Sequence, residues 1–298
     1  MFGVFTVTAD RVAAWLGVAR PAGHRDRPAE AEAGLRFCIS SRTAGHCPLA
    51  ETLDLAARLH FAGVEVWSVD LERTGELPHQ LRRQARSLDL TLICHARTRR
   101  ANIAAPLAGH RRRALATVRS SLRDAAELGA GLCVVHPGKM KSPQHDPEES
   151  WPILVESMAL LSEEATGLGV TIGVEQMEPG RAFFCNPDDI RRLFSAVPSE
   201  HLRLTLDLNH AAKWCLATGT ELAAFVREAE RVAHVHLSDS GGKARHLPLG
   251  EGVLDIPGML DALRCRDYRG TVTIEGRAEG RELAAIEANR RYLRYRES

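Results

Sequence analysis

The 298-residue sequence predicts an α/β fold: a single closed barrel of eight parallel strands, each followed by a helix. Short apolar or β-branched runs alternate with longer segments of helical period, and this alternation occurs eight times. No glycine-rich dinucleotide loop follows the first apolar run, as it would in a doubly wound sheet. The closed barrel is therefore favoured over the open sheet.

The expected strands are short runs rich in Val, Ile, Leu and Thr. They cover Leu35–Ser40, Gly63–Ser68, Leu90–His95, Gly131–His136, Val170–Glu175, Leu202–Asp207, Val232–Leu237 and Thr271–Glu275.

The expected helices lie between these strands and have apolar residues at spacings of three or four. In one of them Leu115, Val118, Leu122 and Ala126 repeat in this way, which predicts one face packed on the sheet. The helical stretches are Ala50–Phe61, Glu76–Ser87, Arg112–Leu128, Glu148–Leu168, Pro187–Phe194, Thr220–Ala229, Ile256–Arg264 and Glu282–Tyr295.

The first 33 residues do not fit this alternation. Asp10 and Arg11 interrupt the apolar start, so a signal peptide is not expected, and Arg20–Gly34 has the proline, glycine and charge content of a linker. We expect residues 1–33 to form an N-terminal extension and residues 34–298 to form one barrel domain.

Composition excludes several classes of protein. With 44% apolar and 26% charged residues the chain can bury a full core, so bulk disorder is excluded. A net charge of +1 creates no overall attraction to nucleic acid, and no apolar run is long enough to span a membrane. The seven cysteines are odd in number and lack any C-x-x-C spacing, which predicts a reducing cytoplasmic location.

Potential metal ligands stand at the ends of six consecutive strands. In or beside these ends lie His95, His136, Glu175, Asp207, His236 and Glu275. The carboxyl ends of barrel strands meet at one mouth, where active sites are built, so these side chains are expected to converge. Three carboxylates in one cavity would repel one another unless a cation neutralised them, and mixed nitrogen and oxygen ligands suit Zn²⁺, Mn²⁺, Co²⁺ or Fe²⁺.

Simpler interpretations exist for individual residues. A single acidic residue at a strand end is more often a helix cap or an ion-pair partner, and His234 is either an alternative ligand to His236 or a hydrogen-bonded core histidine. The arginines at 97, 99 and 100 follow the third strand and either flank the mouth or lie in a solvated loop.

The sequence resembles the sugar phosphate isomerase/epimerase superfamily, the xylose isomerase-like TIM barrels that include endonuclease IV. The likeness covers about residues 35–295. The matching motifs are His136-Pro137-Gly138, Gly173-Val174-Glu175, Leu206-Asp207-Leu208-Asn209-His210, His234-Val235-His236-Leu237-Ser238-Asp239, His246-Leu247-Pro248-Leu249-Gly250-Glu251-Gly252 and Thr273-Ile274-Glu275.

This resemblance implies that Glu175, Asp207, His236 and Glu275 form a metal site for Mn, Zn or Co. In the epimerase-like members, two glutamates matching Glu175 and Glu275 shuttle a proton through an enediolate.

The endonuclease IV-like members use three zinc ions and add ligands that match four further histidines. Those histidines are His95, His136, His210 and His246. The aspartate expected two residues before His246 is Ala244, which leaves a third metal only two protein ligands. The four histidines therefore bind either a second metal or the substrate.

The sequence thus predicts a metal-dependent isomerase or epimerase acting on a small polyhydroxy carbonyl compound, with or without a phosphate group. The alternative is a zinc-dependent phosphoester hydrolase of the endonuclease IV type. We expect no membrane and no nucleic acid as partner, and homo-oligomerisation stays open.

Overall fold

The structure is a computed structural model that describes residues 34–140, 146–180, 183–241 and 244–297. The predicted extension, residues 1–33, lies outside the described residues.

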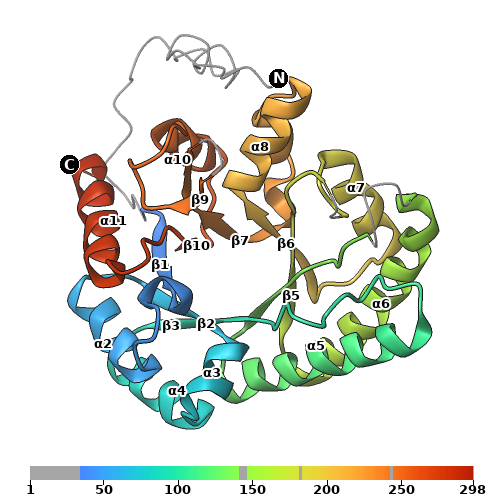
Figure 1. Cartoon of the computed structure of the whole chain (residues 1–298), viewed down its shortest axis with the longest axis horizontal. Coiled ribbons are helices and arrows are strands. Elements are labelled where there is room, and N and C mark those ends of the chain that lie inside the picture. Colours follow the sequence, from blue (N-terminus) through green and yellow to red (C-terminus); the bar gives the residue numbers. More distant parts are fainter. Residues whose placement is uncertain (1–33, 141–145, 181–182, 242–243, 298) are drawn as a thin grey trace.

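Eight parallel strands close into a barrel in the order β1-β10-β7-β6-β5-β4-β3-β2 (Figure 1). Each strand agrees with its predicted range to within one residue at either end. The strands are β1 (Arg36–Ser40), β2 (Gly63–Trp67), β3 (Thr91–His95), β4 (Leu132–Val135), β5 (Thr171–Glu175), β6 (Leu202–Asp207), β7 (Val232–Leu237) and β10 (Thr271–Ile274). The predicted TIM barrel is confirmed.

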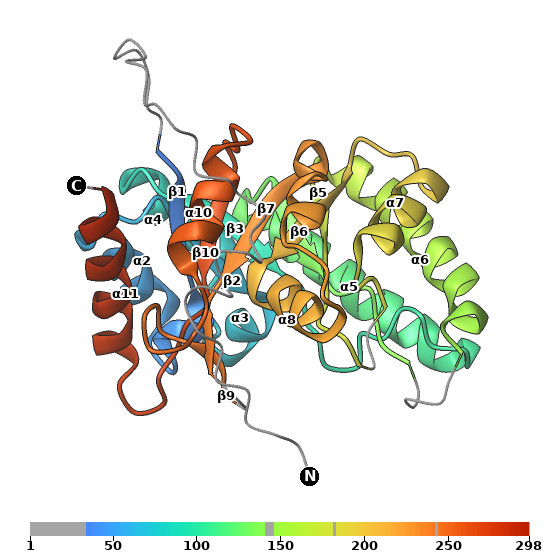
Figure 2. The same ribbon diagram turned by 90° about the horizontal axis from the view of Figure 1, so that it is seen from above.

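Helices surround this barrel. In the turned view of Figure 2 the strands lie between α11 and α2 on one side and α6 and α7 on the other. The helices are α2 (Leu49–Arg58), α3 (Ser68–Thr74), α4 (Pro78–Ser87), α5 (Ala108–Leu128), α6 (Pro147–Leu168), α7 (Pro187–Ala196), α8 (Leu208–Thr218), α9 (Ala223–Val226), α10 (Ile256–Arg264) and α11 (Glu282–Glu297).

The two longest helices end where the sequence predicts. Gly129 and Gly169 stand directly after α5 and α6 in the left-handed conformation, with φ of 68° and 66°. Each cap N–H is bonded to carbonyls of the last turn, and glycine takes this conformation without a Cβ penalty. The chain turns back at once into the next strand.

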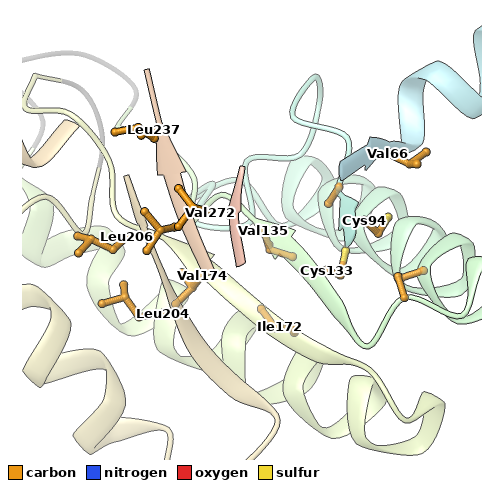
Figure 3. Close-up of a cluster of buried hydrophobic side chains, with 14 of the residues drawn as sticks. Val66, Cys94, Cys133, Val135, Ile172, Val174, Leu204, Leu206, Leu237 and Val272 are labelled. Atoms are coloured by element: carbon orange, nitrogen blue, oxygen red, sulfur yellow. The ribbon is translucent and has the colours of Figure 1, made fainter. Parts of the chain in front are cut away.

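The outward faces of the strands form the main core. Figure 3 shows Ile172 and Val174 of β5 and Leu204 and Leu206 of β6 among these buried side chains. Because side chains alternate along a strand, the residues between them point into the barrel. A separate small apolar cluster of Cys38, Ile93 and Val134 lies on β1, β3 and β4.

One region differs from the predicted pattern. The segment after β6 forms α8, which the sequence analysis did not predict, whereas the predicted helix Thr220–Ala229 is reduced to the short α9 and a 3-10 turn at Ala229–Arg231. The Asp207 side chain caps α8 by accepting from the backbone N–H groups of Asn209 and His210, so the helix begins directly at the strand end. The short α3 was not predicted either.

A further addition is an antiparallel hairpin after β7, formed by β8 (Asp239–Gly241) and β9 (Ala244–Leu247). Within the described ranges, no helix combines the length and the apolar character needed to cross a lipid bilayer.

Candidate metal centre at the barrel mouth

The carboxyl ends of the strands surround a cavity of about 360 Å³. Six of the eight residues singled out from the sequence line it. These are His95, His136, Glu175, His210, His246 and Glu275. The other two, Asp207 and His236, lie beside them and are almost fully buried.

The predicted metal ligands are close together. Ligand atoms of Glu175, Asp207 and His236 all lie within 4.8 Å of one another. The fourth, Glu275, places Oε2 3.6 Å from His236 Nδ1, and Glu175 Oε1 lies 3.4 Å from the same nitrogen. His236 Nδ1 therefore faces both glutamates.

The additional histidines join this group on two sides. His95 and His136 have nitrogens within 4.8 Å of each other and of Glu175, and His136 Nε2 is 2.7 Å from Glu175 Oε2. The His95 Nδ1 lies 2.8 Å from its neighbour's carbonyl at Ala96, which leaves Nε2 facing the cavity. This side of the mouth could hold a second cation.

On the other side, His246 lies with Asp207 and Glu275 in a similar grouping. It stands on β9, and its Nδ1 is 3.6 Å from Glu275 Oε2 and 3.3 Å from Ser238 Oγ. A third cation there would have His246 and two shared carboxylates as neighbours.

Asp207 has two distinct contacts. Its Oδ1 accepts from Asn209 and His210 at 2.8 and 3.0 Å, whereas its buried Oδ2 has no hydrogen-bond donor among the described residues. His210 stands in the first turn of α8 with Nδ1 3.0 Å from the Gln176 carbonyl oxygen and 3.3 Å from Asp207 Oδ2. The helix start thus orients both residues toward the mouth.

Burial and charge move the pKa values of the two glutamates in opposite directions. Burial would raise the pKa of Glu175, but His136 and His236 outweigh it and hold this pKa well below the usual range. The pKa of Glu275 is raised by its burial and by the charges of Glu65 and Glu175, which His236 only partly offsets.

The neighbouring histidines respond to the same carboxylates. Burial alone would lower the pKa of His236, yet Glu275, Glu65 and Glu175 raise it well above its usual value. The pKa values of His95 and His210 are also raised despite burial, by Glu175 and by Asp207 respectively. The site therefore favours positive charge.

These residues fit a divalent cation. The donors are imidazole nitrogens and carboxylate oxygens, a set that suits Zn²⁺, Mn²⁺ and Co²⁺. A buried carboxylate oxygen without a hydrogen-bond donor, such as Asp207 Oδ2, is costly unless it has another partner. A cation would satisfy this oxygen and reduce the repulsion among the acidic groups.

Sequence reasoning missed Glu65, which lies in β2 and is completely buried. Its Oε2 is 2.9 Å from His234 Nε2 and 3.1 Å from His236 Nε2. An acidic residue inside the otherwise apolar strand Gly63–Trp67 was the available signal, since buried charges need partners. His234 also contacts Thr271 Oγ1 through Nδ1, so both of its ring nitrogens have partners.

Other cavity residues also went unpredicted: Ser40, Arg42, Trp67, Met177 and Arg277. Most follow or end a barrel strand, so searching all eight strand ends would have found them. Trp67 stacks on His95 with ring centroids 3.6 Å apart and forms one wall.

The basic cluster after β3 has a different role. Arg97 binds Asp124 at 2.8 Å and Glu72 at 3.3 Å and does not line the mouth cavity. Its guanidinium therefore connects α5 to α3.

The loop that carries His246 is organised by Asp239. This buried carboxylate accepts four backbone N–H groups at 2.8 to 3.0 Å, from Ser240, Gly250, Gly252 and Leu254. Gly252 is required here because a Cβ would lie 2.2 Å from Asp239 Oδ1. The Ser-Asp-Ser and Gly-Glu-Gly stretches of the sequence thus meet in one turn structure.

Sequence relatives with detectable similarity are remote. An uncharacterized protein of Methanocaldococcus jannaschii is 25% identical over 261 residues, covering 82% of this chain and 84% of the relative. The Escherichia coli protein named "Putative L-ribulose-5-phosphate 3-epimerase SgbU" is 26% identical over 172 residues, or 55% of this chain and 58% of that protein.

Solved structures share the fold at lower identity. An L-ribulose 3-epimerase superposes with a TM-score of 0.76 at 16% identity, covering 88% of this chain and 94% of the other. A D-tagatose 3-epimerase-like protein gives 0.71 at 22% identity, with 88% and 98% coverage.

The profile of one protein family matches most of the chain, from residue 53 to residue 296. This match spans seven of the eight barrel strands and includes every residue of the candidate site except those on β1 and its following turn. The chain belongs to the xylose isomerase-like TIM barrel family.

Proposed function

We propose that this protein is a divalent-metal-dependent isomerase or epimerase of a sugar or a related polyhydroxy carbonyl compound. The observation that carries the proposal is the geometry of Glu175 and Glu275, a buried and a largely buried carboxyl group that line one cavity and lie 3.4 and 3.6 Å from the same nitrogen, His236 Nδ1. Their pKa values are displaced in opposite directions. Paired groups with diverging pKa values are typical of sites in which one group accepts a proton and the other donates one.

The candidate metal ligands are Glu175, Asp207, His236 and Glu275. A bound Mn²⁺, Zn²⁺ or Co²⁺ would act as a Lewis acid that polarises a substrate carbonyl and acidifies the adjacent C–H bond. The residues of the chain then carry the proton. Glu175, held in its ionised form, accepts it from carbon, and Glu275, which protonates more readily, returns a proton to the resulting enediolate.

The remaining cavity residues bind and orient such a substrate. His136 and His210 offer ring nitrogens for hydroxyl groups, Trp67 provides an apolar wall, and Arg42 and Arg277 lie at the cavity lining. A cavity of about 360 Å³ suits a small molecule rather than a nucleic acid duplex. The epimerase names of the structural neighbours support a small sugar as substrate.

A second function has one specific observation in its favour. His95, His136 and Glu175 form a further ligand group beside the first, as a dinuclear zinc phosphoester hydrolase would require. The two functions predict different metal contents, namely about one cation per chain for the isomerase and two or three zinc ions for the hydrolase.

Solvent exchange at carbon tests the proposal directly. The metal-loaded protein is incubated with a panel of ketoses, with and without phosphate, in D₂O, and deuterium on carbon is followed by NMR. Proton shuttling by glutamate installs solvent deuterium next to the carbonyl, whereas phosphoester hydrolysis does not. Exchange that persists undiminished in Glu175→Gln and Glu275→Gln would refute the assigned roles.

A further inference from the structure

Glu65 is a carboxylate in the barrel interior, behind the candidate metal ligands. Its side chain has no solvent exposure. Its strand neighbour on β1 is the buried Ser40, and its neighbour on β3, Ile93, belongs to the small apolar cluster with Cys38 and Val134. A carboxylate in such surroundings persists only when it is paired and hydrogen-bonded. Both of its donors, His234 and His236, come from β7 across the barrel.

The contact with His236 determines which ring nitrogen carries a proton. An ionised carboxylate only accepts hydrogen bonds, so His236 Nε2, at 3.1 Å from Glu65 Oε2, must be the N–H. In the neutral ring the lone pair then lies on Nδ1, the nitrogen that faces Glu175 at 3.4 Å and Glu275 at 3.6 Å. Only a nitrogen with a free lone pair can bind a metal.

His234 in turn holds the Glu65 carboxylate in place. Its Nε2 lies 2.9 Å from Glu65 Oε2 and its Nδ1 lies 2.7 Å from Thr271 Oγ1, so the ring is held at both nitrogens. The threonine hydroxyl can accept from Nδ1–H or donate to a bare Nδ1. A chain of hydrogen bonds therefore crosses the barrel interior and ends at the candidate metal centre; it runs through Thr271, His234, Glu65 and His236.

We propose that Glu65 is a positioning residue: it holds His236 in the Nε2–H tautomer and presents Nδ1 as a metal ligand. This inference rests on the proposed function, since it assumes that His236 binds a metal. Carboxylates behind metal-bound histidines act in this way in other metal sites, where their loss weakens metal binding about 10- to 100-fold.

The same three residues allow a competing arrangement. Glu65, His234 and His236 have ligand atoms within 4.8 Å of one another, so they could themselves bind a cation through the two Nε2 atoms. In that arrangement neither Nε2 carries a proton. The tautomer of His236 therefore distinguishes a positioning residue from a ligand.

The test uses the full chain and three variants, Glu65→Leu, Glu65→Gln and Ile93→Val. Leu removes the acceptor at similar volume, Gln keeps an oxygen acceptor without the charge, and Ile93→Val alters interior packing without touching His236. Histidine ¹⁵N–¹H correlation spectra of the metal-free proteins, recorded at a pH high enough for the His236 ring to be neutral and with His236→Gln for assignment, report the tautomer. Competition with a chromophoric chelator reports Mn²⁺, Co²⁺ and Zn²⁺ affinity.

We expect the Nε2–H tautomer of His236 in wild type and in Ile93→Val, and its loss in Glu65→Leu. Metal affinity should fall about 10- to 100-fold in Glu65→Leu, by a smaller factor in Glu65→Gln and by less than about twofold in Ile93→Val. Unchanged tautomer and affinity in Glu65→Leu would overturn the proposal. If that variant does not fold, an Nδ1–H tautomer of His236 in the neutral ring of the wild-type protein overturns it.

The two proposals fail separately. A wild-type protein that binds none of Mn²⁺, Co²⁺ and Zn²⁺ contradicts the proposed function, while the tautomer measured without metal still decides the role of Glu65 toward His236. Metal-induced shifts at the Nε2 atoms of both His234 and His236 would make Glu65 a ligand and overturn the positioning role.

Discussion

The two ends of the barrel each contain a cavity, and the larger one is not at the candidate site. The cavity at the amino ends of the strands measures about 680 Å³, against about 360 Å³ at the mouth. Three of its polar side chains, those of Arg36, Thr91 and Arg290, are hydrogen-bonded within the fold. Arg36 donates to Thr91 Oγ1 at 2.6 Å, and Arg290 donates to the Leu59 carbonyl oxygen at 2.9 Å.

What distinguishes the mouth is not a larger volume but buried oxygen atoms that have no hydrogen-bond donor in the described part of the chain. Among the described residues, buried side-chain oxygens without a hydrogen bond include Asp207 Oδ2 at the mouth and Glu65 Oε1 in the barrel interior behind it. None of the described oxygens of this kind belongs to a residue that lines the cavity at the amino ends of the strands. Unpaired buried acceptors are costly and persist where something else binds them. Converging polar side chains without hydrogen-bond partners therefore indicate the functional site more reliably than the volume of a cavity does.

The largest expected effect comes from the proton-carrying pair. Glu275→Gln should lower isomerisation and deuterium exchange about 10²- to 10⁴-fold, because a positioned acid or base contributes roughly that much. The matched control is Asp89→Asn in the cavity at the amino ends of the strands, where φ is 54° and asparagine is well tolerated. If Glu275→Gln and Asp89→Asn lost the same amount of isomerisation and exchange activity, the activity could not be assigned to the mouth cavity rather than to the cavity at the amino ends.

Metal binding at the mouth should also stabilise the fold. At a free metal concentration of about 100 times Kd, wild type should gain roughly 2.7 kcal/mol in the free energy of unfolding. Asp207→Asn should lose this gain, because it removes the charge at Oδ2 but keeps an amide oxygen that can cap α8. Denaturant titrations with and without Mn²⁺ measure both.

Asp207→Ala serves as the comparison for that variant. It removes the cap as well, so the metal-free protein should be destabilised by about 1 kcal/mol relative to Asp207→Asn. A full metal response in either variant would show that the cation binds elsewhere.

The interior between the cavities should tolerate little added volume. A Cβ at Gly173 would lie 2.3 Å from Thr205 Oγ1, so Gly173→Ala should destabilise the fold by about 1–3 kcal/mol through overpacking. Adding Thr205→Ala removes the clashing oxygen and should recover part of the loss. Additive costs in the double variant, measured by urea unfolding, would show that the two sites do not interact.

The smallest effect concerns reagent access through the barrel. Cys38 is completely buried, and burial together with the charge of Glu65 raises its pKa to about 12. Reactive thiolate is nearly absent below that pKa, so at pH 8 a disulfide reagent should label exposed Cys265 rapidly and Cys38 only after unfolding. Fast labelling of Cys38 in the native protein would indicate that solvent reaches the interior from one of the cavities.

The barrel and the convergence of most residues of the candidate site could be predicted from residue patterns, because both depend on periodicity. Alternating apolar runs defined the strands, and Glu175, Asp207, His236 and Glu275 stand at their ends. Glu65 escaped prediction because its role depends on His234 and His236, which are about 170 residues away in sequence and meet it only across the closed barrel. Helix α8 escaped because its cap, Asp207, was interpreted only as a metal ligand.

The two carboxylate oxygens of Asp207 have different roles, and this difference affects how the candidate centre would bind a cation. Oδ1 is anchored by two backbone N–H groups at the start of α8, so Oδ2 keeps its direction whether or not a cation is present. Little side-chain entropy is then lost when an ion arrives. Asp207, a short acidic side chain that caps a helix, is thus a ligand of fixed orientation. The longer glutamate side chains can adjust more, so they should determine how well the site accepts ions of different radius.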